Sequence, residues 1–429
     1  MTRATTGEKK EKREKTMILH IDADAFFVAC EVARLPALKG KPVIVGGERG
    51  IACAMSYEAK ALGVTRGMPV FEIKRKYTNT IILPAHFELY YAYRNNLISF
   101  LKSRFEKIEV YSIDECFIEV TEGEIAFTEE SLEELRKEIE DFTGISYSLG
   151  LADTKTLAKI ASKKNKPRGS YFLKRDGDKD FLYCLPLSFI WGIGWRMTKT
   201  LEGLGLFTVK DLVLTNDSIL QKNFSIQLLR TKQELLGIKC FLLEERSACQ
   251  KGMQVTRSFA RTEDIVFVLS ELCTNVEEFC INLQRENLEA ESVDVWIKEV
   301  KNGKDVYLNY SIFLGEATNN HRAILKAMSS TILQIRDLKK GIMRGTGVYG
   351  KTVSKSREKT LELFSKTTGL EEINTTSILS NLRSKFGSTA LMIAGSMTAT
   401  KKRTQERDRY DKESFYLRGL PYPYLGEVR

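Results

Sequence analysis

Short apolar runs, and runs in which apolar and polar residues alternate, predict β-strands at several places in the first half of the chain. MILHIDADAFF (17–27) predicts the first strand, and KPVIVGG (41–47) predicts a second that ends at a glycine turn. In KIEVYSIDECFIEV (107–120), two alternating segments meet near Asp114 and Glu115. A hairpin would therefore present both acids at its turn.

Other segments have the spacing of amphipathic helices. SLEELRKEIEDF (131–142) begins with Ser131 and Glu134, which form a capping box. Its apolar side chains share one helical face: Leu132, Leu135, Ile139 and Phe142. SYEAKALGV (56–64) predicts the start of another helix. Strands that alternate with helices predict an α/β first half.

The pattern changes twice farther along the chain. From about residue 186 it becomes helical and glycine-rich, around WGIGWRMTKTLEGLGL (191–206). From about residue 253 it predicts an α+β region, with strands such as VDVWIKEV (293–300) and VYLNYSIFL (306–314). The polar segment LLEERSACQKG (242–252) between these regions is typical of a linker. The charged and polar residues 1–16 predict a disordered leader.

Length, charge and cysteine usage narrow the class of protein. A chain of 429 residues is long enough for about three domains. Its 66 basic residues outnumber its 56 acidic residues, which favours a polyanionic partner such as nucleic acid. The eight cysteines lack zinc-type spacing and predict reduced thiols in the cytosol. No apolar run approaches the roughly 18 residues of a membrane span, so we expect a cytoplasmic protein without a membrane partner.

Two acidic motifs indicate chemistry. Asp22 and Asp24 are two residues apart on a predicted strand and share a face, although two solvated acids at a strand end would give the same pattern. Neither this motif nor the one at Asp114 and Glu115 contains a nearby Lys or Arg. Buried carboxylates need a cation to offset their charge, and Mg²⁺ prefers carboxylate oxygens. Two such ions about 4 Å apart support phosphoryl transfer.

Six motifs together resemble, in order and spacing, those of the Y-family translesion DNA polymerases, most closely the UmuC-type branch. They are HIDADAFFVACE (20–31), SYEAKALGVTRGMP (56–69), VYSIDECF (110–117), GLADTKTLAKIA (150–161), WGIGWRMTKTLEGLG (191–205) and VTRSF (255–259). The resemblance spans about residues 17–400 and implies a DNA-directed DNA polymerase. It also implies two Mg²⁺ ions, for which Mn²⁺ can substitute. Their ligands would be Asp22, Asp114, Glu115 and the backbone carbonyl of Ala23. Asp24 matches a position that is not a ligand.

The resemblance also implies the dNTP contacts. Phe27 falls where the family places a ring against the sugar C2′ position, the steric gate, and Phe26 precedes it. Tyr57 and Lys60 would share a helix face and contact the triphosphate, although an ordinary exposed face is the alternative. Lys166 lies near the position where the family supplies a lysine to the triphosphate.

Three further regions predict contacts with primer-template DNA. Gly192 and Gly194 lie in a helix-hairpin-helix pattern, a helix followed by a tight glycine turn and a second helix, which binds DNA backbone. Residues 322–359 contain ten basic residues against two acids, and Arg257 lies in the motif that opens the same module. Lysines recur every fourth residue on one side of a predicted helix, which we expect to add to DNA binding: Lys155, Lys159 and Lys163.

The last motif, KTLELF (359–364), resembles the peptide by which bacterial polymerases dock on the sliding clamp. Its apolar anchors are Leu361, Leu363 and Phe364, and Thr360 replaces the usual Gln. An amphipathic helix turn is the alternative. INTTSILSNLRSKFG (373–387) predicts a small helical tail. UmuD-like and RecA-like partners and a bacterial, nucleoid-associated location belong to the same resemblance.

We therefore expect an α/β and α+β multidomain fold, the right-hand polymerase with palm, fingers, helix-hairpin-helix thumb and little finger domain. The expected boundaries are a leader at 1–16, palm at 17–25 and 86–174, fingers at 26–85, thumb at 175–245, linker at 246–252, little finger at 253–354, and a tail at 355–429 with the clamp-binding-like motif at 360–364. A catalytically silent DNA-bound adaptor in a mutasome is one alternative. Another two-metal phosphotransferase, such as a nuclease or cyclase, is the second.

Overall fold

The computed structural model describes residues 15–47, 50–244, 252–336, 341–355, 375–386, 391, 393–403 and 405. These residues fall into two compact units, divided between Glu244 and Gly252. Nearly all of the predicted leader and linker, and all of the clamp-like motif at 360–364, lie outside the described residues.

A five-stranded sheet with the order β5-β6-β1-β7-β8 forms the centre of the first unit. Its strands are β1 (Thr16–Ala23), β5 (Ile108–Val110), β6 (Glu115–Thr121), β7 (Tyr147–Ala152) and β8 (Ser170–Phe172). All neighbours are antiparallel except β7 and β8. The prediction that the first strand reaches residue 27 is wrong. Ala25 has a φ of 46°, which ends the extended chain and starts a helix at Phe26.

The predicted hairpin around the two acids is confirmed. β5 pairs with β6 in a register that places Ile108 opposite Ile118 and Val110 opposite Cys116. Asp114 lies in the connecting turn, and Glu115 is the first residue of β6. The alternation in the sequence therefore positions both acids at one end of the sheet.

Three helices contact strands of this sheet: α4 (Phe87–Lys102), α5 (Glu129–Thr143) and α6 (Lys155–Lys164). The predicted capping box of α5 is wrong: the helix begins two residues before Ser131, because the Thr128 side chain accepts a hydrogen bond from the Ser131 N–H at 3.2 Å. Of the four predicted apolar residues, three are buried, but Phe142 is 56% exposed. Its ring packs only against Phe100, with centroids 5.2 Å apart.

Residues 26–83 form a small sheet and short helices. The sheet order is β3-β2-β4, which confirms the strand predicted at 41–47. The elements are α1 (Phe26–Arg34), a 3₁₀ turn (Pro36–Leu38), β2 (Val43–Val45), β3 (Ala54–Met55), α2 (Tyr57–Ala61), α3 (Val70–Lys76) and β4 (Ile81–Leu83). The helix predicted from residue 56 is α2, whose cap Ser56 accepts from the Ala59 N–H.

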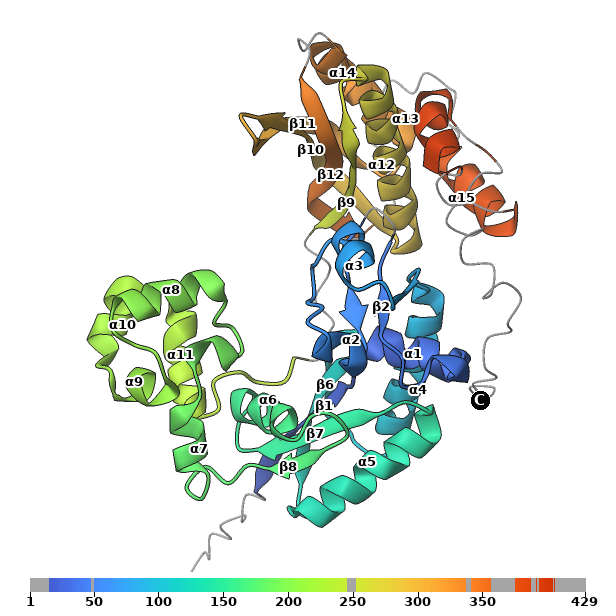
Figure 1. Ribbon diagram of the computed structural model, residues 1–429. Helices are drawn as coiled ribbons and strands as arrows, with labels where there is room; N and C mark the ends of the chain where they lie inside the picture. Colours follow the sequence, from blue (N-terminus) through green and yellow to red (C-terminus); the bar gives the residue numbers. More distant parts are fainter. Residues whose placement is uncertain are drawn as a thin grey trace, which may run out of the picture. The chain divides into compact units, whose positions relative to one another are not determined.

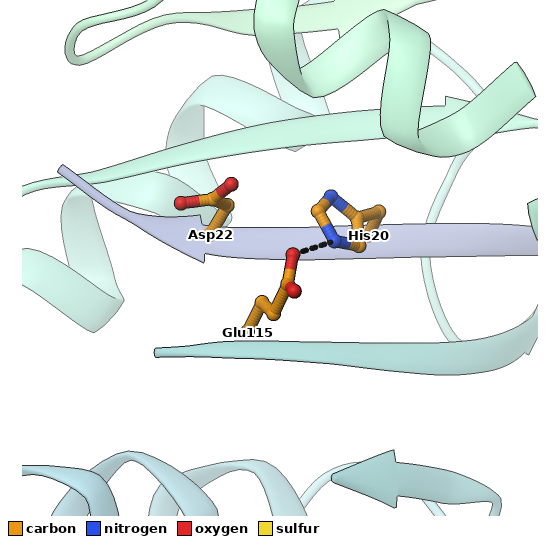
Figure 2. Close-up of side chains that lie close together, drawn as sticks. All are labelled: His20, Asp22 and Glu115. Atoms are coloured by element: carbon orange, nitrogen blue, oxygen red, sulfur yellow. Dashed lines mark hydrogen bonds and ion pairs between the residues drawn. The ribbon is translucent and has the colours of Figure 1, made fainter. Parts of the chain in front are cut away.

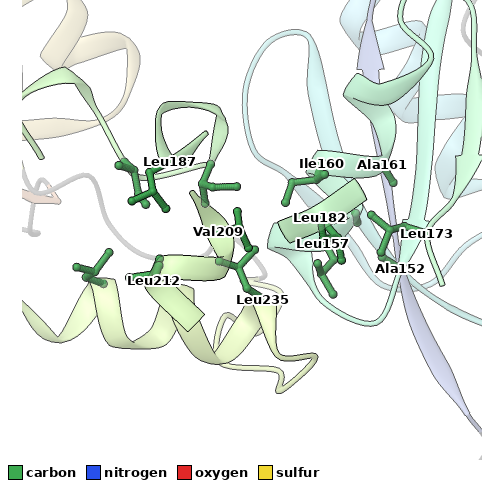
Figure 3. Packing of buried hydrophobic residues seen from close by; sticks show 14 of the residues in the cluster. Ala152, Leu157, Ile160, Ala161, Leu173, Leu182, Leu187, Val209, Leu212 and Leu235 are labelled. Atoms are coloured by element: carbon green, nitrogen blue, oxygen red, sulfur yellow. The ribbon is translucent and has the colours of Figure 1, made fainter. Parts of the chain in front are cut away.

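A cluster of helices completes the first unit: α7 (Lys179–Cys184), α8 (Trp195–Gly203), α9 (Val209–Leu214), α10 (Asp217–Asn223) and α11 (Ile226–Leu235). The full helix predicted before the glycine turn is wrong. Only a 3₁₀ turn, Leu187–Phe189, precedes it, because Pro186 is extended and lacks an N–H. Figure 3 shows leucines of this cluster packing near those of α6, with Leu157 and Leu235 among them.

The second unit is built on a four-stranded antiparallel sheet with the order β11-β10-β12-β9. Its elements are β9 (Met253–Thr262), α12 (Ile265–Arg285), β10 (Leu288–Lys301), β11 (Lys304–Thr318), α13 (His321–Ala327), α14 (Ser329–Arg336) and β12 (Ile342–Lys355). Both strands predicted at 293–300 and 306–314 are confirmed within β10 and β11. Helix α12 lies alongside this sheet (Figure 1), and its apolar residues pack with those of the sheet into one core.

The predicted tail helix is confirmed as α15 (Thr375–Phe386), and a 3₁₀ turn (Ala394–Ser396) follows it. This segment is tied to α12 by ion pairs with buried acids. Arg383 lies 2.7 Å from Glu277, and Arg403 pairs with Glu271. The described residues of the tail therefore belong to the second unit.

The cysteines in the described part of the chain are all free thiols. Among these residues, no helix combines the length and apolar character needed to cross a bilayer.

Gly150 in β7 allows α6 to lie directly on the sheet, because a Cβ there would overlap the backbone of Ala158 and Ser162. We predict that Gly150→Ala lowers the free energy of unfolding by at least about 2 kcal/mol. Gly203→Ala is the matched control, since no atom lies within 4 Å of its added Cβ and its position is helical. Chemical denaturation of both variants checks this, and equal stabilities would contradict it.

Candidate active site

Three side chains converge at the end of the central sheet. One ligand atom from each of His20, Asp22 and Glu115 lies within 4.8 Å of the others. His20 and Asp22 are two residues apart on β1 and share a face, while Glu115 lies directly opposite Asp22 in the β1–β6 ladder. Figure 2 shows Glu115 reaching from β6 toward the His20 ring. The sheet thus places two carboxylates side by side.

The His20 side chain holds the carboxylate of Glu115 in position. The ring is fully buried, with Nε2 3.2 Å from Glu115 Oε2 and Nδ1 2.7 Å from Ser162 Oγ. Burial lowers the pKa of His20, outweighing the carboxylates that favour its charged form. A neutral ring that donates from Nε2 to the carboxylate accepts a hydrogen bond from the Ser162 hydroxyl at Nδ1. Both ring nitrogens are therefore used to hold neighbours in place.

Two lysines offset the charge of the acids. Lys159 Nζ lies 2.7 Å from Glu115 Oε2, and Lys166 Nζ bonds Asp22 Oδ1. Burial by itself raises the pKa of Glu115, but the hydrogen bonds from His20 and Lys159 outweigh it and lower the pKa to about 2. For Asp22, burial dominates and raises the pKa against the opposing effect of Lys166. The two acidic motifs have no lysine or arginine close to the acids in sequence, but the fold brings in two lysines that are distant in sequence.

The predicted lysine face of α6 is turned toward the protein. Lys155 is only 3% exposed and pairs with Glu109, while Lys163 Nζ lies 3.4 Å from the Phe189 carbonyl. The close approach of α6 to the sheet directs these side chains toward acids and aromatic rings. The prediction that this lysine row contributes to DNA binding is therefore wrong for the buried Lys155, and it stays a prediction for the partly buried Lys159 and Lys163.

Asp114 is held differently from the other two acids. Its carboxylate accepts a hydrogen bond from Ser112 Oγ, and it is not part of the group formed by His20, Asp22 and Glu115. Its backbone carbonyl accepts from the Ala23 N–H at 2.9 Å. The structure therefore places Asp114 beside the predicted carbonyl ligand Ala23, and a role for both in metal binding remains a prediction.

Asp24 is a buried anchor. It is 2% exposed and accepts from Ser148 Oγ and the Arg168 backbone N–H, both at 2.8 Å. Tyr57 Oη lies 3.5 Å from the same carboxylate, and burial together with this neighbour raises the pKa of Tyr57. Asp24 thus fixes the loop after α6, in which Lys166 lies. Lys60, on the same short helix as Tyr57, is exposed.

The aromatic pair at the start of α1 separates into a buried and an accessible ring. Phe26 is 5% exposed, whereas Phe27 is half-buried. The Phe27 ring stacks on Tyr90 with centroids 4.3 Å apart and meets Phe87 edge-on at 5.8 Å. Tyr90 donates to the buried Glu31 at 2.7 Å, so the platform beneath Phe27 is itself fixed.

The predicted DNA contacts lie in both units. Gly192 has a φ of 86°, and Gly194 caps α8; an added Cβ at either would meet no atom within 4 Å. The turn is therefore open to a close ligand. Arg257, in β9, lies 3.6 Å from Glu271. The clamp-binding residues predicted at 361–364 lie outside the described residues.

The sequence analysis missed His20 and Ser162. A signal for His20 was available, because it stands two residues before Asp22 on the same strand and so shares its face. No local signal indicates Ser162, which reaches the site only because α6 packs on β1 and β7.

The architecture is known from solved proteins. A Y-family DNA polymerase chimera has a similar structure with a TM-score of 0.66 and 24% identity, over 79% of this chain and 99% of that chain. An insertion ternary complex of Dbh DNA polymerase gives a TM-score of 0.51 and 25% identity over the same shares. The predicted right-hand fold of the Y-family DNA polymerases is confirmed.

Proteins that are similar in sequence belong to the same class of polymerase. The model of the impB/mucB/samB family matches residues 21–163. A DNA polymerase IV of Neisseria meningitidis serogroup C is 32% identical over 289 residues, 66% of this chain and 81% of the relative. A DNA polymerase IV of Dehalococcoides mccartyi is 29% identical over 378 residues, covering 86% and 95%. Protein ImpB of Salmonella typhimurium is 34% identical over 249 residues, covering 56% and 59%. The chain therefore belongs to the impB/mucB/samB family of Y-family DNA polymerases.

We predict that His20→Leu weakens binding of Mn²⁺, a spectroscopic substitute for Mg²⁺, by about 10- to 100-fold, because Glu115 loses the donor that orients it. His20→Gln, which keeps an amide donor, should recover most of the affinity. Paramagnetic titration of the free protein checks this, with thermal unfolding as a control for folding. Equal affinities in the parent and the Leu variant would contradict it.

Proposed function

We propose that this protein is a translesion DNA polymerase that adds dNTPs to a primer 3′-OH opposite damaged template bases. The observation that carries the proposal is the pair of opposed carboxylates, Asp22 and Glu115, at the end of the family's central sheet. The polymerase names of the relatives support the reaction, and the ternary complex of a structural neighbour supports primer-template DNA and a nucleotide as ligands.

The donor set fits a hard divalent cation such as Mg²⁺. Asp22 and Glu115 supply carboxylate oxygens, while both nitrogens of His20 are engaged with protein partners. Asp114 and the Ala23 carbonyl, adjacent through their backbones, complete the proposed ligand set for two ions. When bound, such ions polarise the α-phosphate and activate the primer hydroxyl.

The remaining residues position the substrates. Lys166, beside Asp22, is placed to neutralise triphosphate oxygens, and Tyr57 with Lys60 extends the polar surface on α2. Phe27, fixed on Tyr90, is the ring proposed to exclude a 2′-OH. Fixed groups of this kind reduce the entropy lost on reaching a reactive geometry.

DNA and protein partners follow the same resemblance. The open turn at Gly192 and Gly194 and the strand with Arg257 are proposed to hold the DNA backbone without sequence readout. Leu361, Leu363 and Phe364 are proposed to dock on a sliding clamp. UmuD-like and RecA-like partners and a nucleoid-associated location are part of the same proposal.

The first test compares two acids that are two residues apart, Asp22 in β1 and Asp24 in the turn that follows it. We predict that Asp22→Asn lowers the rate of primer extension by at least about 1,000-fold, because a charged oxygen ligand is lost. The primer-template affinity should stay within a few-fold, since other surfaces carry it. Asp24→Asn is the matched control and should chiefly lower stability, because its carboxylate anchors a loop. Extension by Asp22→Asn at a tenth of the parent rate would refute the assignment.

The second test concerns the sugar. We predict that Phe27→Ala raises incorporation of a ribonucleotide relative to its deoxynucleotide at least about tenfold, because an open pocket rejects an added hydroxyl only weakly. Phe87→Ala removes a neighbouring, half-exposed ring and should leave the ratio unchanged. Measuring kcat/KM for one rNTP and its dNTP decides the matter, and an unchanged ratio in Phe27→Ala would place this ring in the core.

A further inference from the structure

A cavity of about 700 Å³ lies within the first unit, away from the acidic pair, and the proposed reaction gives it no role. It opens between β5, the turn at Trp191–Ile193, helix α11 and the segment 240–244. This volume lies in the range of about 300–1,000 Å³ that is usual for small-molecule sites.

The wall of the cavity is aromatic and rigid. Trp191 meets Tyr111 edge-on, with centroids 5.3 Å apart, and its Nε1 donates to Tyr111 Oη at 3.0 Å. Phe241 also meets the indole edge-on, with centroids 5.6 Å apart. Fixed rings of this kind offer faces and edges on which a planar group stacks, as bases do on aromatic side chains in nucleic-acid complexes.

The floor of the cavity is charged but internally satisfied. Lys155 Nζ bonds Glu109 and also donates to the Leu242 carbonyl at 2.8 Å. Glu109 Oε2 further accepts from the Glu244 backbone N–H at 2.8 Å. Because these charges offset each other, the floor does not select an ionic ligand.

The mouth supplies the polar groups. Gln227 and Arg230 are exposed on α11 and border the cavity, which adds an amide and a guanidinium at its edge. An aromatic wall, a neutral floor and a rim of donors and acceptors match an uncharged flat ring whose edge carries hydrogen-bonding groups.

We propose that this cavity binds one planar heteroaromatic ring of nucleobase size. Two sources share that chemistry: a free nucleoside-like molecule, and an unpaired base of bound DNA. Gly192 lines the cavity and also belongs to the turn proposed to hold DNA backbone, so a strand bound at that turn would lie next to the cavity. Binding of an unpaired DNA base rests on the proposed function, whereas binding of a free nucleoside-like molecule does not.

The cavity is joined to the candidate active site by its own wall. Lys159 Nζ, which bonds Glu115, lies 4.8 Å from the centroid of Tyr111 and 5.5 Å from that of Trp191. A bound ring that shifts the indole therefore changes the surroundings of the ammonium that holds a carboxylate of the site. Lys159 thus contacts both a carboxylate of the site and two aromatic residues of the cavity wall.

The experiment uses the full chain and adenosine as the free probe, without DNA or metal. Saturation-transfer NMR should show saturable binding of adenosine and none of cyclohexylmethanol, an apolar molecule without an aromatic ring. Gln227→Trp, which fills the mouth from an exposed position, should weaken adenosine binding at least tenfold. Gln221→Trp, the same change on the exposed face of α10 away from the cavity, should leave it unchanged.

A second arm identifies the source. A primer strand carries 2-aminopurine at one position after another, and its emission is compared between the two Trp variants. If adenosine binding is saturable and the 2-aminopurine emission at one position differs twofold between the variants, the cavity binds a base of the bound DNA. If adenosine binding is saturable but the emission does not differ at any position, the cavity binds a free nucleoside-like molecule. No saturable binding, or binding that survives Gln227→Trp, as it would at the dNTP site, overturns the proposal. The adenosine arm does not depend on catalysis, so it is independent of the Asp22→Asn test.

Discussion

Two like charges placed opposite each other in a β-ladder are the constraint on which the first unit depends. Asp22 and Glu115 face each other across β1 and β6, an arrangement that is unfavourable unless cations or donors offset it. His20 and the two lysines supply that compensation from three separate parts of the chain. The structure around this pair of acids therefore depends on charge compensation as well as on the burial of apolar side chains.

Helix α6 links this arrangement to the rest of the unit. Its polar side carries Lys159 to Glu115 and Ser162 to His20, and its apolar side contributes Leu157 and Ile160 to the core that it shares with the α7–α11 cluster. Gly150 makes the close packing possible. One helix thus couples the position of the predicted thumb to the geometry of the carboxylates.

The sequence predicted those parts of the site that depend on local pattern. The hairpin at 107–120 follows from alternation, and the strands of the second unit follow in the same way. The partners of the acids could not be derived locally, because Lys166 lies 144 residues from Asp22 in the chain and reaches it through a loop anchored on Asp24. In the row of lysines on α6, Lys155 was misjudged for the same reason: periodicity defines a helix face but not whether it meets solvent or a buried acid.

The charge balance of the site also bears on how metal and nucleotide would be bound together. In the protein alone, Lys159 and Lys166 already offset the charges of Glu115 and Asp22. On the proposed function, divalent cations held by the same carboxylates leave a surplus of positive charge that only an anion can offset. A triphosphate supplies that anion, and Lys166, displaced from Asp22, is then available to its oxygens. The ion pairs seen here therefore favour binding of metal and nucleotide as one unit over binding of either alone.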